Sequence, residues 1–236
     1  MMYLANDKFI GRSLDAYGEF CELELYLFRQ IIKPGMTVVE AGANIGTHTV
    51  AFAKAVGATG KVLTFEPQRT VFHMLCGNLA LNGLSNVQAI NGGLGAEAAT
   101  LRVPSIDYAS EHNFGGAQLS ESGDGHAVSV TTLDSWELEA CHLIKADVEG
   151  MELEVLQGAT ETIKRFNPFL YIENDRTDLS KGLLEWLLRA NYRLYWHICQ
   201  LFSENNFFAN QENVFGGYLC VNVLECLPLR PSTSHR

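Results

Sequence analysis

The stretch Val38–Phe52 constrains the fold of this chain more than any other segment. Its sequence, VVEAGANIGTHTVAF, passes from an apolar run ending at Glu40 through Gly42 and Gly46 directly into a helical pattern. This predicts a strand, a tight turn and a helix start, because glycine tolerates backbone angles and close approaches that side chains prevent. The free N–H groups of a helix N-terminus favour an anionic ligand group. A βαβ unit that begins this way typically binds a nucleotide-like cofactor.

The remaining pattern predicts an α/β fold, doubly wound around a mostly parallel, seven-stranded, Rossmann-like sheet. Strands and helices alternate, and this order favours parallel strands with right-handed crossovers. Apolar periodicity predicts the sheet strands at residues 37–41, 61–65, 87–90, 143–148, 169–172, 192–198 and 214–224, with a further strand at 128–133. It predicts helices at residues 17–32, 46–56, 69–81, 152–166 and 182–190. We expect the strand at 214–224 to be an antiparallel edge strand.

Charge and composition argue against several classes of partner. The formal net charge is −10, whereas a nucleic-acid partner normally requires a basic face, so we expect none. No apolar run reaches the length of a membrane span, and the N-terminus has no signal-peptide pattern. We therefore expect a cytoplasmic protein without a membrane span. The polar segment 104–127 is either a functional lid or a disordered excursion, and the sequence leaves the oligomeric state undetermined.

The turn after the first strand indicates which cofactor binds. A dinucleotide fingerprint needs glycine where this chain has Asn44 and Thr47, and no Gly-Lys-Ser/Thr of a phosphate loop follows. The remaining pattern, E-x-G-x-N-x-G, is that of turns that bind S-adenosylmethionine. We expect the methionine carboxylate at backbone N–H groups near Gly46 and Thr47. Glu40 is then placed to accept from the cofactor's ammonium, directly or through water, with Gly42 and Asn44 completing the turn.

Glu66 ends the second strand, about twenty residues beyond the glycines. A carboxylate at that position is placed to accept hydrogen bonds from the ribose hydroxyls. The alternative is a carboxylate at the strand end that pairs with Arg69.

Four runs of sequence carry a more specific resemblance. VVEAGANIGTHT, LTFEPQ, LIKADVEGMELEVLQGA and YIEND together resemble the FkbM-type methyltransferases, over most of the chain from Tyr17 to about Cys220. The resemblance implies a class I, S-adenosylmethionine-dependent O-methyltransferase whose acceptor is a hydroxyl of a sugar, a glycoconjugate or a natural product. Residues 36–226 would form the methyltransferase domain, residues 1–35 a helical addition packed on it, and residues 227–236 a flexible tail. The alternative is a non-catalytic, cofactor-binding or scaffold protein that kept the fold.

Acidic residues after two strands are the candidates for chemistry. Asp147 and Glu149 follow the strand expected beside the first one, where the strand order reverses and ligands of such sheets bind. Methyl transfer to an alcohol requires a group that takes the hydroxyl proton, and Asp147 is the first candidate, with Glu149 the second. The alternative is that both only stabilise the following helix. Glu173 and Asn174 end the next strand and are substrate candidates.

Two questions about ligands remain after the sequence analysis. Asp147, Glu149, Glu173 and Asn174 could supply oxygen ligands to a divalent metal, but clustered carboxylates alone do not favour that alternative, and we assign no metal ligand. Phe207 and Phe208 stand in an Asn-rich loop that is similar to a sugar-binding surface, and they are the other substrate candidates. The alternative is that these phenylalanines pin the loop to the core.

Overall fold

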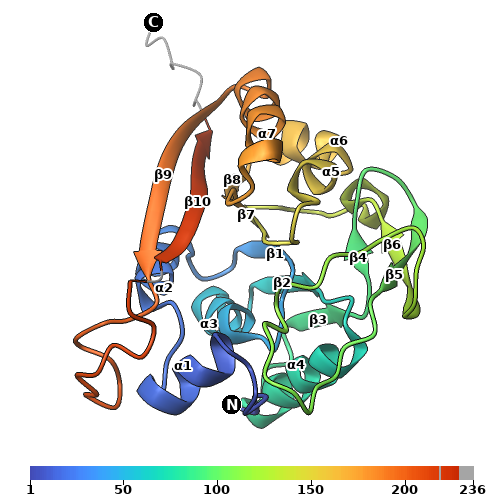
Figure 1. Cartoon of the computed structure of the whole chain (residues 1–236). Helices are drawn as coiled ribbons and strands as arrows, with labels where there is room; N and C mark the ends of the chain where they lie inside the picture. Colours follow the sequence, from blue (N-terminus) through green and yellow to red (C-terminus); the bar gives the residue numbers. More distant parts are fainter. Residues whose placement is uncertain (218, 229–236) are drawn as a thin grey trace, which may run out of the picture.

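A seven-stranded sheet forms the centre of the molecule in the computed structural model, which describes residues 1–217 and 219–228 (Figure 1). In spatial order its strands are β3 (Val87–Ile90), β2 (Lys61–Phe65), β1 (Thr37–Ala41), β7 (Leu143–Ala146), β8 (Phe169–Glu173), β10 (Leu219–Pro228) and β9 (Tyr192–Gln200). The first five are parallel, which confirms the predicted fold class. The strand order reverses between β1 and β7, so the crevice expected for a ligand lies at their carboxyl ends.

The end of the sheet differs from the prediction in one respect. The antiparallel strand β10 lies between β8 and β9, so that β9 forms the edge. A strand at the last place in the sequence need not take the last place in a sheet. β10 also begins at Leu219 and not at residue 214. Of the tail predicted at 227–236, the first two residues end this strand, and residues 229–236 lie outside the described part of the chain.

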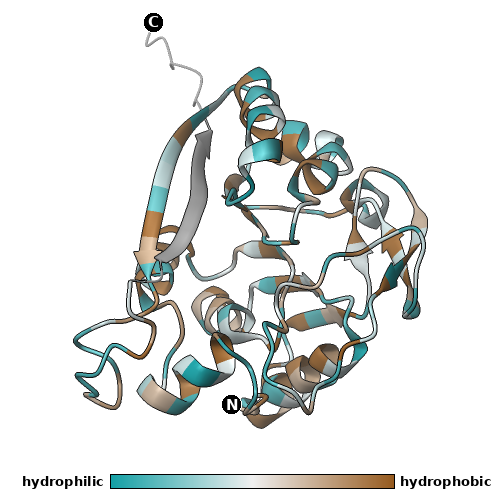
Figure 2. Ribbon diagram, viewed as in Figure 1, coloured by the Kyte–Doolittle hydropathy of each residue, from teal (hydrophilic) through white to brown (hydrophobic). Residues whose placement is uncertain are grey.

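Helices cover both faces of the sheet. On one face α2 (Glu22–Ile31) and α3 (Thr47–Val56) pack on β1, and Phe28 contacts Phe52 and Tyr171 at ring distances of 4.8 and 4.5 Å. The opposite face is covered by α5 (Glu152–Gln157), α6 (Thr160–Phe166) and α7 (Thr177–Arg189). α4 (Arg69–Leu81) packs beside α3. Hydrophobic and hydrophilic segments alternate along these helices, as expected for elements with one buried side (Figure 2).

Two predicted helices differ from the structure. The helix predicted at 17–32 is α2, which begins only at Glu22, and it is preceded by a helix that was not predicted, α1 (Ile10–Tyr17), which ends where Gly18 takes the left-handed conformation at φ 74°. The predicted helix 152–166 is broken around Gly158, where a Cβ would lie 1.9 Å from the Gly95 carbonyl oxygen. Apolar periodicity did not reveal the helix end at Gly18 or the break at Gly158, since the hydrophobic spacing continues across both glycines.

A second, three-stranded sheet has the order β4-β6-β5, with strands β4 (Gly93–Leu94), β6 (His126–Thr131) and β5 (Ala99–Val103). The strand predicted at 128–133 therefore belongs outside the main sheet, and a short 3₁₀ helix, η1 (Leu133–Trp136), follows it. Between β5 and β6, the candidate lid segment is tied to the N-terminus. Lys8 N–H donates to the His112 carbonyl, and His112 N–H donates to the Asn6 carbonyl. Phe114 is fully buried, and Gln68 Nε2 donates to its carbonyl at 2.7 Å.

Candidate active site

A cavity of about 810 Å³ opens at the carboxyl ends of β1, β2, β7 and β8. The N-terminal helices supply one wall through Phe9, Ile10 and Phe20. The loops after the strands supply most of the polar residues that line the rest of the cavity. Six acidic side chains line this cavity: Glu24, Glu66, Asp147, Glu149, Glu173 and Asp175. It is large enough for a drug-sized ligand and lies at the switch point of the sheet.

The turn after β1 contains three residues with left-handed backbone angles, at alternate positions. Gly42, Asn44 and Gly46 have φ angles of 81°, 50° and 88°. A Cβ on Gly42 would lie only 1.8 Å from the Asp147 carbonyl oxygen, so this glycine allows β1 and β7 loops to approach each other. Gly46 does not face the cavity: a Cβ there would meet Leu75 of α4 at 2.6 Å. This position does not support a direct contact between Gly46 and a ligand, and that role stays a prediction.

The start of α3 is suited to an anionic group. The Gly46 N–H donates to the Ala43 carbonyl at 2.9 Å, whereas the Thr47 N–H has no partner among the described residues. Thr47 lines the cavity. Of the two N–H groups predicted to hold a carboxylate, only that of Thr47 is available.

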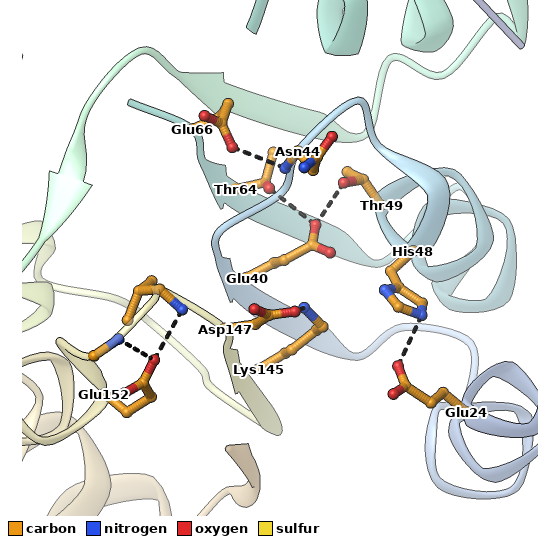
Figure 3. Close-up of polar contacts among 12 residues, drawn as sticks. Glu24, Glu40, Asn44, His48, Thr49, Thr64, Glu66, Lys145, Asp147 and Glu152 are labelled. Atoms are coloured by element: carbon orange, nitrogen blue, oxygen red, sulfur yellow. Dashed lines mark hydrogen bonds and ion pairs between the residues drawn. The ribbon is translucent and has the colours of Figure 1, made fainter. Parts of the chain in front are cut away.

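Glu66 lies at the end of β2 and is 3 % exposed (Figure 3). Its carboxylate accepts from the Asn44 N–H at 2.9 Å and from the Gln68 N–H at 2.8 Å, and no ion pair joins it to Arg69 in the described residues. Burial raises the pKa of Glu66 to about 7, against the lowering effect of these two N–H groups. The backbone thus fixes this carboxylate in the cavity wall, with unused acceptor capacity on both oxygens.

We expect Glu66→Ala to weaken S-adenosylhomocysteine binding by roughly 1–3 kcal/mol, because ribose hydroxyls would lose their acceptor. The affinity of the unmodified protein should rise with pH through about 7, since the ionised carboxylate accepts two hydroxyl donors. Glu66→Gln should remove that dependence. Titration calorimetry between pH 6 and pH 8 measures both effects. An Arg69→Ala variant is the control, and equal losses in both variants would favour the Glu66–Arg69 pairing instead.

Glu40 lies behind the cavity wall. It is fully buried and does not line the cavity. Its Oε2 accepts from the hydroxyls of Thr49 and Thr64, while Oε1 has no partner among the described residues (Figure 3). Burial raises the pKa of Glu40, and the nearby Lys145 ammonium opposes that shift. Direct contact between Glu40 and a cofactor finds no support in this position.

Lys145 and Asp147 form an ion pair at the end of β7, with Nζ 3.1 Å from Oδ2. Lys145 is buried, whereas 42 % of the Asp147 side chain is exposed toward the cavity. Burial alone would lower the pKa of Lys145, but Asp147, Glu40 and Glu24 surround the ammonium and raise it. Burial would raise the pKa of Asp147, but the ammonium holds it below its usual range. Asp147 is therefore a permanent anion and a weak proton acceptor near pH 7.

The loop after β7 is held by an acidic residue of α5, Glu152. The Oε1 atom of buried Glu152 accepts from the N–H groups of Val148 and Gly150, at 3.1 and 3.0 Å (Figure 3). Glu149, between them, has a φ of 58°, which is strained for a residue with a side chain. Its carboxylate accepts from Arg176 Nη2 at 2.6 Å. Burial and the Asp147 charge raise the pKa of Glu149 to about 7.

Glu173 joins the same carboxylate group from β8. Its Oε2 is buried without a hydrogen-bond partner among the described residues. Burial, Asp147 and Glu149 raise the pKa of Glu173 well above its usual range. One oxygen each of Asp147, Glu149 and Glu173 lies within 4.8 Å of the others, a spacing that would also suit a divalent cation. The metal alternative therefore stays open to experiment.

The other predicted substrate residues lie away from the cavity. Asn174 is buried and does not line it. Phe207 and Phe208 are 79 % and 57 % exposed, and they contact each other beside α1 rather than the cavity or the core. Their exposure contradicts the alternative that they pin the loop to the core, whereas the interpretation as a sugar-binding surface stays a prediction.

Sequence reasoning missed a buried pair in the cavity wall. His48 Nε2 of α3 lies 3.1 Å from Glu24 Oε2 of α2, and both side chains are 7 % exposed (Figure 3). His48 also stacks on Phe52. His48 is visible in the sequence at the start of a predicted helix, but its partner comes from another helix whose packing the sequence did not reveal.

With this geometry in view, comparison with known proteins identifies the family. The FkbM methyltransferase domain matches residues 40–194. The chain belongs to the FkbM methyltransferase family. Sordaria araneosa methyltransferase sdnD is 32% identical over 157 residues, which cover 52% of this chain and 60% of that protein. The hexuronic acid methyltransferase AglP of Haloferax volcanii is 28% identical over 153 residues, which cover 62% of this chain and 60% of that protein. The chain thus matches less than two thirds of the length of these relatives.

Solved structures show the same fold. A methyltransferase FkbM from Methylobacillus flagellatus superposes with a TM-score of 0.56 at 17% identity, covering 86% of this chain and 50% of that one. Aeropyrum pernix fibrillarin with natively bound S-adenosylmethionine superposes with a TM-score of 0.51 at 12% sequence identity, and the match covers 87% of this chain and 73% of that one. A putative rRNA-methylase from Clostridium thermocellum has a TM-score of 0.51 at 16% sequence identity, and the match covers 87% of this chain and 92% of that one. Such a fold gives no ground to exclude a nucleic-acid acceptor. Within the described residues, no helix is both long and apolar enough to cross a membrane.

Proposed function

We propose that this FkbM-family chain is an S-adenosylmethionine-dependent O-methyltransferase acting on a hydroxyl of a sugar, a glycoconjugate or a natural product. The observation that supports the cofactor most is the cavity between Glu66 and the free Thr47 N–H, which offers acceptors for ribose hydroxyls and a donor for a carboxylate. Residues 1–35 contribute Phe9, Ile10 and Phe20 to the remaining wall, and we assign this side to the acceptor. The relative that acts on hexuronic acid supports a sugar as one acceptor class.

The two carboxylates after β7 suit different roles. When bound, the cofactor supplies an electrophilic methyl group on its sulfonium. The acceptor oxygen forms the new C–O bond as the C–S bond breaks, and the hydroxyl proton must leave to a base. Asp147, kept ionised by Lys145, is suited to orient the hydroxyl. Glu149, whose pKa is about 7, is suited to take the proton, because a base works best when its pKa is near the operating pH. This reverses the order of the two candidates expected from the sequence.

We expect the purified protein to bind S-adenosylmethionine and S-adenosylhomocysteine, and to bind NAD poorly. The physical reason is that Asn44 and Thr47 replace two glycines that a dinucleotide turn needs. Titration calorimetry decides: tighter binding of NAD would contradict the assignment. Release of S-adenosylhomocysteine with a panel of hydroxylated acceptors then separates an enzyme from a non-catalytic binding protein. The same assay with EDTA and with added Mg²⁺ tests the metal alternative.

A further inference from the structure

Arg176, the residue that precedes α7, contacts two segments that are distant from each other in the sequence. Its Nη2 atom donates to Glu149 Oε2, in the loop after β7, at 2.6 Å. With its amide oxygen turned toward the guanidinium, Gln118 accepts from Nη1 at 2.6 Å and from Nη2 at 3.0 Å. Gln118 belongs to the candidate lid segment, residues 104–127. One side chain therefore connects the proposed base to that segment.

The loop after β7 has no side chain at the residue against which this arginine packs. Gly150 has a φ of 104°, and a Cβ there would lie 3.2 Å from both Cδ and Nε of Arg176. The side chain of Arg176 is 28 % exposed and that of Glu149 20 %, so water and salt screen this ion pair less than a pair on the surface. Glu152 of α5 fixes the backbone of the loop, and Arg176 fixes the carboxylate that the loop carries.

The charge of Arg176 also matters for the ionisation of Glu149. Four ionisable groups from the ends of β7 and β8 and from the start of α7 face this carboxylate: Asp147, Glu173, Asp175 and Arg176. Of these four, only Arg176 carries a positive charge. A cation in direct contact favours the ionised carboxylate, which is the form that can accept a proton. Arginine stays protonated throughout, so it takes no part in the proton transfer itself.

The candidate lid segment meets the cavity at other points as well. Asn113 and Gly115 line the cavity, and a Cβ on Gly115 would lie 3.1 Å from Asn44 Nδ2 of the turn after β1. Phe114, between them, is fully buried. The segment is therefore packed over the site, and the hydrogen bonds of Gln118 join it to the group that holds Glu149.

Resting on the proposed function, we propose that Arg176 is a positioning residue, which aligns Glu149 for proton transfer and ties that alignment to Gln118 of the candidate lid segment. Arg176 does not line the cavity, so it acts through Glu149 and not on the acceptor. The guanidinium suits this role because its planar fork of N–H groups binds two acceptors at once, whereas an ammonium is a point charge. In the reaction the acceptor oxygen takes the methyl group and the hydroxyl proton passes to Glu149, while Arg176 keeps all of its protons.

The dependence of turnover on pH tests the contact with Glu149. Arg176→Gln should move the rise of turnover upward by about one pH unit or more, because Glu149 loses the cation that favours its ionised form. Arg176→Lys keeps the charge but not the fork, so it should leave the rise near its place and lower kcat about tenfold. Arg189→Gln removes an exposed arginine of the same helix and should change neither quantity. A merely structural role would lower kcat without moving the pH profile.

Hydrogen exchange tests the link to the candidate lid segment without any acceptor. Gln118→Ala and Arg176→Gln should each raise amide exchange in residues 113–120 by about threefold or more, because the segment loses the same contact in both variants. Gln118→Ala should also lower kcat about threefold and leave the pH profile in place, since the charge of Arg176 remains. Glu121→Ala, which removes an exposed side chain of the same segment, is the control and should leave exchange unchanged.

The outcomes separate this inference from the proposed function. If Glu149→Gln removes the dependence of turnover on pH but Arg176→Gln leaves the profile in place, the positioning role is overturned and the proposed function stands. Unchanged exchange and unchanged kcat in Gln118→Ala would overturn the link to the candidate lid segment. If Glu149→Gln keeps the dependence, or if S-adenosylhomocysteine does not bind, the proposed function fails and this inference fails with it.

Discussion

Glu149→Gln should lower turnover by about two to four orders of magnitude, the typical effect of losing a general base. In the unmodified protein, turnover should rise with pH through about 7, because protonated Glu149 cannot accept the hydroxyl proton and the ionised form can. The variant should lose this rise. Initial rates of S-adenosylhomocysteine formation between pH 6 and pH 9, with the acceptor found by screening, measure both effects.

Asp147→Asn provides the contrast. Lys145 already holds the pKa of Asp147 below its usual range, so this carboxylate stays ionised throughout the measured interval. The variant should turn over more slowly, because the acceptor is held less well, but it should keep the dependence on pH. If Asp147→Asn loses the dependence of turnover on pH while Glu149→Gln keeps it, Asp147 is the base instead. Circular dichroism is needed beside the rates, since Asp147→Asn leaves the buried Lys145 ammonium with less compensation.

Gly42→Ala should abolish measurable cofactor binding. A single methyl group at Gly42 would lie 1.8 Å from the Asp147 carbonyl oxygen, so the turn after β1 and the loop after β7 could not keep their present separation. These two loops carry the residues on both sides of the cavity. The clash is therefore with the protein itself and not with a ligand. Calorimetry with S-adenosylhomocysteine measures the loss.

Gly83→Ala is the matched control for this experiment. Gly83 also has a left-handed backbone, with φ at 64°, but a Cβ there would meet nothing within 4 Å. Both substitutions therefore introduce similar backbone strain, on the order of 1 kcal/mol, and only that at Gly42 introduces a clash. If both variants bind the cofactor with normal affinity, the contact between the two loops does not shape the site. If both lose binding equally, backbone strain alone explains the effect.

Local sequence patterns determined much of this protein. The parallel order of β1, β2 and β3 follows from alternating strands and helices, and α4 begins and ends at its predicted residues, Arg69 and Leu81. The position of Glu66 at the end of β2 was likewise predictable, because a strand end and the residue after it are fixed by the chain itself. The family resemblance depended on the same kind of contiguous runs, and the match over residues 40–194 confirms it.

Tertiary structure decided what depends on residues far apart in the sequence. Whether Asp147 or Glu149 suits proton transfer depends on Lys145 and Arg176, whose charges set the two carboxylates apart. A side chain at Gly46 would meet α4, and Phe207 is exposed to solvent, and neither position could be predicted from the neighbouring sequence. A pattern of residues indicates which chemistry a chain can perform. The pKa of each group, and the side of the wall on which it lies, arise only when packing sets the distances between charges and excludes water from some of them.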